Sequence, residues 1–130
     1  MPVNRVFVYG TLRPGLKNYR VVEKFVLAVY PATAQGRLFD LPYGYPAMIE
    51  GDGTVSGEVL ELKEIRKALK VLDRLEGYSE TSSRNLYIRV LIEVKLKGGD
   101  RVEAYTYYWD HPNELPRLGK ELPEGKWGKK

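Results

Sequence analysis

The sequence predicts an α+β domain in which a small mixed, mostly antiparallel sheet curls into a β-barrel, accompanied by two helices. Short β-rich runs separated by turn residues recur along the chain, and a segment with a clear helical stripe interrupts them. The last long run, at residues 101–109, carries large apolar side chains on both faces, as Tyr107 and Tyr108 illustrate. A strand with two apolar faces favours a closed barrel over an open, one-sided sheet.

The first half of the chain is expected to contain two strands and a helix. Pro14-Gly15 marks a loop after the first β-rich run, while Pro31 and Gly36 interrupt the second. The expected order is a strand at 5–9, a loop at 10–16, a helix at 17–27, an interrupted strand at 29–39 and a loop at 40–46.

A hairpin and a second helix are expected next. Strands at 46–50 and 54–61 are separated by Gly-Asp-Gly, a combination typical of a hairpin turn. The segment 63–76 has the apolar spacing of a helix, and Gly77 stands where a glycine commonly follows a helix end.

The chain is expected to finish with a second hairpin and an irregular segment. Residues 86–97 alternate between apolar and polar side chains, and a Gly-Gly-Asp turn joins them to the strand at 101–109. Residues 110–130 are rich in proline, glycine and charge, which is typical of an irregular extension. With 130 residues, we expect a single domain spanning 1–130.

Composition excludes several kinds of chemistry. The chain has no cysteine, which excludes disulfides, thiolate nucleophiles and thiolate metal sites. Its single histidine, His111, excludes multi-histidine metal sites and leaves little for a Ser-His-Asp triad. Phosphate-binding glycine motifs and metal-ligand spacings are also missing. We therefore expect no cofactor and no metal.

Apolar and charged runs bear on location and partners. No apolar run approaches the roughly 18 residues of a membrane span, and nothing resembles a signal peptide, so we expect a cytoplasmic protein without membrane association. The net charge of +4 owes part of its excess to four lysines among the last eleven residues. A solvated tail is the favoured interpretation, with no nucleic-acid partner. The alternative, binding to nucleic acid through this tail, would weaken steeply with salt.

One acid of the helix at 63–76 lies on its apolar side. At 3.6 residues per turn, Leu69 and Leu72 belong to a narrow apolar stripe, and Glu76 falls inside it. A carboxylate placed where the core should be is costly, and desolvation raises its pKa towards the range useful for proton transfer near neutral pH. The alternative is a frayed helix end from which Glu76 reaches solvent.

The exit of the first strand is a second candidate site. Gly10 follows the strand directly, and a glycine there allows a ligand to approach the backbone closely. Consecutive amide N–H groups in such a loop can bind an anion or a developing oxyanion. An ordinary tight turn is the alternative. Lys17, just beyond the loop, is expected to lie outside the site.

These two features occur within a wider resemblance. The stretch VFVYGTLRPG, followed some sixty residues later by LDRLEGY, resembles the γ-glutamylcyclotransferase-like family. The similarity spans nearly the whole chain and includes GRLFDLPYGYPAMI at 36–49, TVSGEVLEL at 54–62 and a Gly-x-Trp near the end. The Tyr-Gly-Thr-Leu-Arg loop is similar to that of a small subgroup that includes enzymes acting on γ-glutamyl-amine conjugates.

The resemblance implies a barrel with a cavity at one end and assigns residues to it. Glu76 matches the family's catalytic glutamate, and Tyr107 falls where the family often has a tyrosine facing the cavity. The backbone of the first loop would hold the glutamyl group, and the positions are Tyr9, Gly10, Thr11 and Leu12.

Four further positions match the family less directly. Tyr87 and Tyr105 are additional candidates for the cavity wall, and Arg89 matches a recurrent arginine whose role could be structural. Trp127 matches a family aromatic residue, so we expect it to dock against the barrel.

The function implied is γ-glutamylcyclotransferase activity. A small-molecule γ-glutamyl amide would cyclise to 5-oxoproline and release its amine, with Glu76 as general acid and base. The alternative is a small-metabolite binding module that keeps the barrel without turnover. Neither the amine nor the oligomeric state follows from these motifs.

Overall fold

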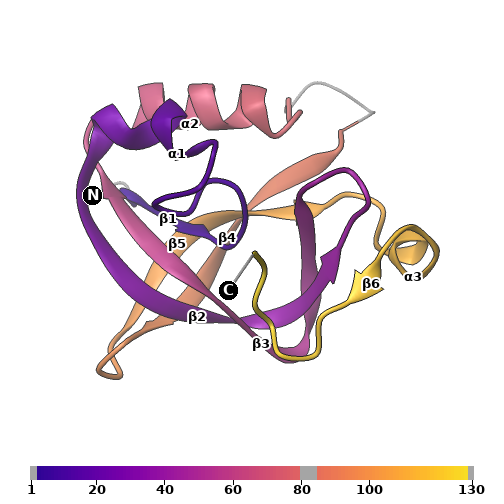
Figure 1. Cartoon of the computed structure of the whole chain (residues 1–130). Coiled ribbons are helices and arrows are strands. Elements are labelled where there is room, and N and C mark those ends of the chain that lie inside the picture. Colours follow the sequence, from indigo (N-terminus) through magenta and orange to yellow (C-terminus); the bar gives the residue numbers. More distant parts are fainter. Residues whose placement is uncertain (1–2, 80–84, 129–130) are drawn as a thin grey trace.

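The structure, a computed structural model, describes residues 3–79 and 85–128 and contains the expected barrel (Figure 1). Its strands follow the order β3-β1-β5-β4-β2-β6, and an additional β2–β3 pairing closes the first five into a barrel. The pairing of β1 with β5 is parallel and the other pairings are antiparallel. The predicted mixed, mostly antiparallel α+β barrel is therefore confirmed.

The elements of the described chain share a pattern of long central strands and short flanking pieces. They are β1 (Arg5–Val8), α1 (Tyr19–Val22), a 3₁₀ turn (Glu23–Phe25), β2 (Val26–Asp40), β3 (Pro46–Leu62), α2 (Ile65–Leu75), β4 (Tyr87–Leu96), β5 (Arg101–Trp109), a second 3₁₀ turn (Pro112–Glu114), α3 (Leu115–Leu118) and β6 (Lys120–Glu121).

Helix α2 confirms the helix predicted at 63–76. It buries Ala68, Leu69 and Leu72, the stripe seen in the sequence, and lies across the top of the barrel in Figure 1. Gly77 follows the helix with a φ of +69°, in the left-handed region that a glycine adopts readily. None of the helices in the described residues is long and apolar enough to cross a membrane.

The predicted hairpin at 46–61 is wrong, because β3 is one continuous strand. It pairs antiparallel with β2 on both sides of Gly-Asp-Gly, with Ile49 opposite Arg37 and Thr54 opposite Gln35. Residues 50–53 therefore stand opposite the single Gly36, as an enlarged bulge. A Cβ on Gly53 would lie 2.9 Å from the carbonyl oxygen of Gly36. The glycines permit close backbone approach at a bend instead of reversing the chain.

The helix predicted at 17–27 is shorter than expected. After α1 and one 3₁₀ turn, Val26 already belongs to β2 and pairs with Leu62. The amide of Lys63 also donates a hydrogen bond of 2.8 Å to the carbonyl of Phe25. Pairing with a distant strand therefore ends the helix before its apolar pattern does. The second strand, in turn, runs through Pro31 without a break, because its pairing with β4 starts only at Ala32.

The hairpin predicted at the end of the barrel is confirmed. β4 and β5 pair from Tyr87 opposite Trp109 to Lys95 opposite Arg101. Along β1, alternate side chains enter two different buried clusters, so the strand has no exposed apolar face.

The C-terminal segment crosses the barrel surface and docks Trp127. The Trp127 indole packs on the buried cluster that contains Phe7, and its Nε1 donates a hydrogen bond of 2.9 Å to the Asp40 carboxylate. Farther back, the Gly125 carbonyl accepts a hydrogen bond of 2.7 Å from Ser56. The segment includes α3 and β6, more regular structure than its composition indicates, and residues 129–130 lie outside the described part.

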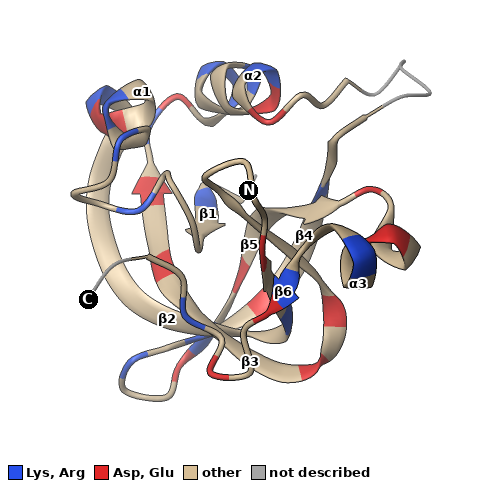
Figure 2. Cartoon of the chain, turned by 45° about the vertical axis from the view of Figure 1, so that its right-hand side comes forward, with Lys and Arg blue, Asp and Glu red and all other residues tan. Residues whose placement is uncertain are grey.

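Charge is spread over the surface. Figure 2 shows Lys and Arg interspersed with Asp and Glu along the ribbon, and both signs occur on α2. Among the longer elements of the described chain, β2, α2, β4 and β5 each carry charges of both signs.

Candidate active site

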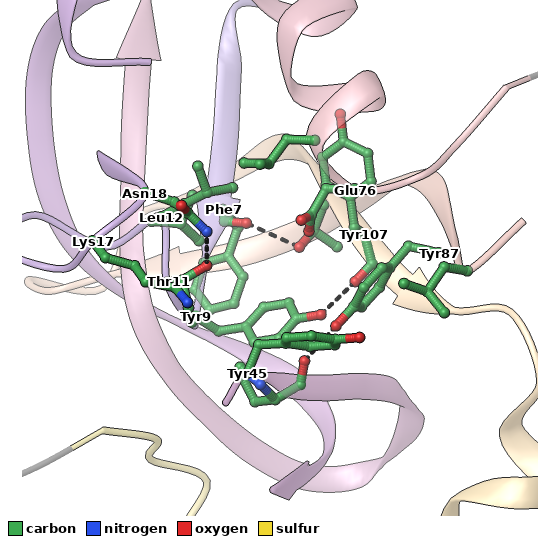
Figure 3. A pocket seen from close by; sticks show the side chains of 16 residues that line it. Phe7, Tyr9, Thr11, Leu12, Lys17, Asn18, Tyr45, Glu76, Tyr87 and Tyr107 are labelled. Carbon is green, nitrogen blue, oxygen red and sulfur yellow. Dashed lines mark hydrogen bonds between the residues drawn. The ribbon is translucent and has the colours of Figure 1, made fainter. Parts of the chain in front are cut away.

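A pocket of about 280 Å³ opens between the exit of β1, the end of α2 and the adjoining ends of β4 and β5 (Figure 3). The six residues that the sequence assigns to a site all line it, namely Tyr9, Gly10, Thr11, Leu12, Glu76 and Tyr107. The further candidate Tyr87 lines it as well, whereas Tyr105 does not. The structure thus brings the loop and the helix end, far apart in the sequence, to one cavity.

Glu76 projects into this pocket from the last turn of α2. Its amide donates a hydrogen bond of 2.9 Å to the Leu72 carbonyl, which keeps the helical geometry up to Gly77. The residue as a whole keeps some exposed surface, but its carboxyl group lies among the pocket walls (Figure 3). Burial there raises the pKa of Glu76 to about 7. No hydrogen bond from another described residue reaches this carboxyl group.

Tyrosine rings supply the walls around Glu76. The Tyr9 hydroxyl donates a hydrogen bond of 2.7 Å to the Tyr107 carbonyl, and the Tyr87 hydroxyl donates one of 2.6 Å to the Pro46 carbonyl. Burial raises the pKa of both Tyr9 and Tyr87, so both phenols stay neutral at physiological pH. Both hydroxyl groups thus donate their protons to backbone carbonyls and not to the Glu76 carboxyl group. The rings therefore exclude water from the carboxyl group, which is the cause of its raised pKa.

Tyr107 contributes its ring to the pocket, but its hydroxyl group points elsewhere. It donates a hydrogen bond of 2.6 Å to the Asp73 carboxylate on α2. The Arg89 guanidinium pairs with the other oxygen of Asp73 and stacks over the rings of Tyr78 and Tyr105. Asp73 lies one helical turn before Glu76. Tyr107 and Arg89 thus anchor the end of α2 to β5 and β4.

The loop after β1 lines the pocket and is held by its own hydrogen bonds. The Gly10 carbonyl accepts from Arg13 at 3.0 Å, and the Thr11 carbonyl accepts from Asn18 at 2.9 Å. The Asn18 side chain also donates to the Thr11 hydroxyl at 2.8 Å. Within the described residues, the amide N–H groups of Gly10, Thr11 and Leu12 donate no hydrogen bond. Three unpaired donors thus belong to residues that line the pocket, and such donors can stabilise an oxyanion.

The loop is also fixed by the contacts of Arg13 and by the close packing of Gly10 against Pro46. Arg13 forms a bidentate pair with Glu58, at 2.7 and 2.9 Å, and donates to the Trp127 carbonyl at 3.3 Å. A Cβ on Gly10 would lie 2.7 Å from Cγ of Pro46, so only glycine fits beside that ring.

The pocket residues that the sequence analysis missed include Lys17, Asn18 and Tyr45. Lys17 lines the pocket, so the expectation that it lies outside the site is wrong. Tyr45 enters from the β2–β3 loop, with its ring centroid 6.3 Å from that of Tyr87. Its position in DLPYGYP, within the family-like stretch, is the only sequence signal that could have identified it. Among the described residues that line the pocket, Lys17 is the one cation and Glu76 the one acid.

Metal ligands are not gathered here. The described residues contain no group of three or more His, Asp or Glu side chains that could hold a metal ion.

The sequence matches the model of the family described as "Gamma-glutamyl cyclotransferase, AIG2-like" over residues 6–129. This chain belongs to that family. It is also 34% identical over 111 residues to the gamma-L-glutamyl-butirosin B gamma-glutamyl cyclotransferase of Niallia circulans, a match that covers 85% of this chain and 69% of that protein. Membership and this relative together establish the chain as a cyclotransferase-type enzyme.

Solved structures share its fold. Protein ytfP from Escherichia coli superposes with a TM-score of 0.63 at 26% identity, covering 95% of each chain. YkqA from Bacillus subtilis reaches a TM-score of 0.70 at 24% identity, covering 95% of this chain and 39% of that one. The chain therefore spans well under half of YkqA.

Proposed function

We propose that this enzyme cleaves γ-glutamyl amides by intramolecular cyclisation, releasing 5-oxoproline and a free amine, with Glu76 as the proton-transfer residue. One observation carries the proposal: a carboxyl group with a pKa of about 7 lies in the same pocket as three residues whose backbone amides are unpaired. A carboxyl group with this pKa suits proton transfer at neutral pH, and unpaired backbone amides suit the stabilisation of an oxyanion. The name of the Niallia circulans relative supports the γ-glutamyl part of the substrate.

The chemistry is balanced without any co-reactant. The α-nitrogen of the glutamyl group attacks its own γ-carbonyl carbon, so one C–N bond forms and the C–N bond to the amine breaks. Two protons leave the α-nitrogen, and two arrive at the departing nitrogen. Glu76 can carry each proton in turn, because both nitrogens belong to the same tetrahedral carbon in the intermediate.

The pocket has two remaining tasks. It must hold the extended glutamyl chain in a folded conformer, which brings the gain that proximity gives to intramolecular reactions. It must also stabilise the negative oxygen of the tetrahedral intermediate. We assign that role to the amides of Gly10, Thr11 and Leu12, and a single such donor is worth about 3 kcal/mol in well-studied enzymes.

A non-catalytic binding module fits the site less well. A binding module has no need of a desolvated carboxyl group, and such a group costs stability wherever it must ionise. The raised pKa of Glu76 therefore favours turnover over binding alone.

The proposal is tested by incubating the protein with a panel of γ-glutamyl amines and γ-glutamyl amino acids and assaying for 5-oxoproline. Release of 5-oxoproline from at least one compound is expected. Binding of the panel without release of 5-oxoproline, even at long incubation, would favour the binding module instead.

A further inference from the structure

The Arg13 side chain connects three segments of the chain that are distant in the sequence. Its guanidinium forms two hydrogen bonds with the Glu58 carboxylate on β3, at 2.7 and 2.9 Å. It also donates to the carbonyl of Trp127 in the C-terminal segment, at 3.3 Å. Arg13 does not line the pocket itself. Any effect of Arg13 on a bound ligand must therefore pass through the loop after β1, to which it belongs.

The main chain of Arg13 controls one of the loop amides. The Arg13 amide donates a hydrogen bond of 3.0 Å to the Gly10 carbonyl. In a planar trans peptide unit the carbonyl and the following N–H group point in opposite directions, so this bond also fixes the direction of the Thr11 N–H group. Thr11 carries one of the three unpaired amides that we assign to the oxyanion. The direction of that donor therefore depends on where Arg13 is held.

We propose that Arg13 is a positioning residue that couples the docked C-terminal segment to the amides of the loop after β1. This inference rests on the proposed function, which gives those amides their role in the reaction. Donors stabilise an oxyanion efficiently only when they are already oriented before the reaction begins. A side chain that holds the loop from outside the pocket supplies this orientation without touching the substrate.

The pair between Arg13 and Glu58 is suited to holding a loop. The two side chains are only 27% and 18% exposed, so solvent screens this pair less than a fully exposed one. A guanidinium that forms two parallel hydrogen bonds with a carboxylate fixes direction as well as distance, which a lysine cannot do. The C-terminal segment is joined to the same part of β3, because the Ser56 amide donates to the Gly125 carbonyl at 2.7 Å.

The test compares Arg13→Ala and Arg13→Lys with the matched control Arg37→Ala. Arg37 also forms a bidentate pair, with Glu121 at 2.8 and 2.9 Å, and so it too connects the C-terminal segment to the barrel. Among the described residues, however, no hydrogen bond joins Arg37 to the loop after β1. The control therefore separates loosening of the C-terminal segment from loss of the loop contact.

Steady-state kinetics should distinguish these variants on a γ-glutamyl amide that the wild type cleaves. Arg13→Ala should lower kcat by at least about tenfold and change KM by less than about threefold, because the loss falls on the transition state. Arg13→Lys should stay at least about threefold below wild type, and Arg37→Ala should stay within about twofold of it. Full activity of Arg13→Lys, or an equal fall in Arg37→Ala, would overturn the positioning role.

A second measurement follows the coupling in the opposite direction and requires no turnover. Coupling between two sites is reciprocal, so saturation with 5-oxoproline should slow hydrogen exchange of the Trp127 indole N–H group by at least about threefold. Trp127 does not line the pocket, so the ligand does not cover it directly. The effect should disappear in folded Glu58→Gln, and unchanged exchange in the wild type would contradict the coupling. Failure of the wild type to release 5-oxoproline would contradict the proposed function, whereas indole exchange would still decide the coupling.

Discussion

The hydroxyl group of Tyr107 donates a hydrogen bond of 2.6 Å to the carboxylate of Asp73, three residues before Glu76 on α2. β5 thereby holds the helix end that carries the candidate catalytic acid. Arg89 pairs with the same carboxylate from β4, so α2 is anchored at two points of the barrel wall. Both contacts position Glu76 without touching a ligand.

Tyr107→Phe should lower both stability and turnover. Loss of a hydrogen bond to a charged group costs about 1.5–3 kcal/mol, which denaturant unfolding can measure. The looser helix end should lower kcat more than it raises KM, because proton transfer depends on the placement of Glu76. Tyr108→Phe is the matched control, since its ring packs on the other cluster and no hydrogen bond of its hydroxyl is found among the described residues. Equal effects of both changes would remove Tyr107 from the positioning role.

The pH dependence of kcat/KM should follow Glu76. The proton acceptor must be ionised in the free enzyme, and its pKa is raised to about 7 by burial. We therefore expect kcat/KM to rise about tenfold per pH unit below pH 7 and to level off above it. An acid limb centred near pH 4.5, the value of an unburied glutamate, would show that Glu76 is not the group being titrated.

Stability should depend on pH through the same group. Between pH 4.5 and about 7 the folded protein keeps a proton on Glu76 that the unfolded chain has lost, so the free energy of unfolding falls as pH rises. Glu76→Gln removes this dependence. The variant should match wild type near pH 4 and be more stable by about 3 kcal/mol at pH 8, because each pKa unit corresponds to about 1.4 kcal/mol. Parallel unfolding curves for the two proteins at all pH values would contradict the buried carboxyl.

Gly10→Ala should lose binding of 5-oxoproline. The added Cβ would lie 2.7 Å from Cγ of Pro46, so the loop must shift and turn its amides. We expect at least about a tenfold weaker Kd by calorimetry, since two or more donors would move. Pro14→Ala, an exposed change in the same loop, is the control and should be neutral. Adding Pro46→Ala to Gly10→Ala should restore part of the binding, and a failure to do so would point to a different cause.

Trp127→Ala should lower the melting temperature. The indole covers part of a core cluster and its Nε1 is hydrogen-bonded to Asp40, so a loss of about 2 kcal/mol is expected. For a chain of this size that corresponds to a shift of roughly 5 °C. Trp127→Phe keeps the ring contact and should lose less than half as much. An unchanged melting temperature in Trp127→Ala would mean that the docked C-terminal segment contributes nothing to stability.

Local patterns predicted the elements whose partners are near in the sequence. The apolar stripe of α2, the glycine that ends it and the β4–β5 hairpin were predicted because short-range spacing determines them. The same local reasoning failed at Gly-Asp-Gly, where pairing with β2 keeps the chain extended through a bulge. It also failed at Val26, because a strand partner 36 residues away replaced the last helical turn.

The candidate site was likewise predicted where short-range patterns determine it and missed where distant segments meet. Glu76 was found from its place on the helix, and the loop amides were found from Gly10 at a strand exit. Lys17 and Tyr45 enter the pocket only through the folding of two loops, which no periodicity encodes. The role of Tyr107 was only half predicted, because its hydroxyl partner Asp73 looks like an ordinary surface residue of an amphipathic helix.

The most direct test of the central claim is product analysis for wild type and Glu76→Gln on a γ-glutamyl substrate in water enriched in oxygen-18. Wild type should release 5-oxoproline and amine in equal amounts, with no label in the 5-oxoproline, because the attacking group is the substrate's own nitrogen. Glu76→Gln, folded and still able to bind 5-oxoproline, should release neither. Labelled glutamate in place of 5-oxoproline, or a variant that keeps most of the wild-type rate, would contradict cyclisation driven by Glu76.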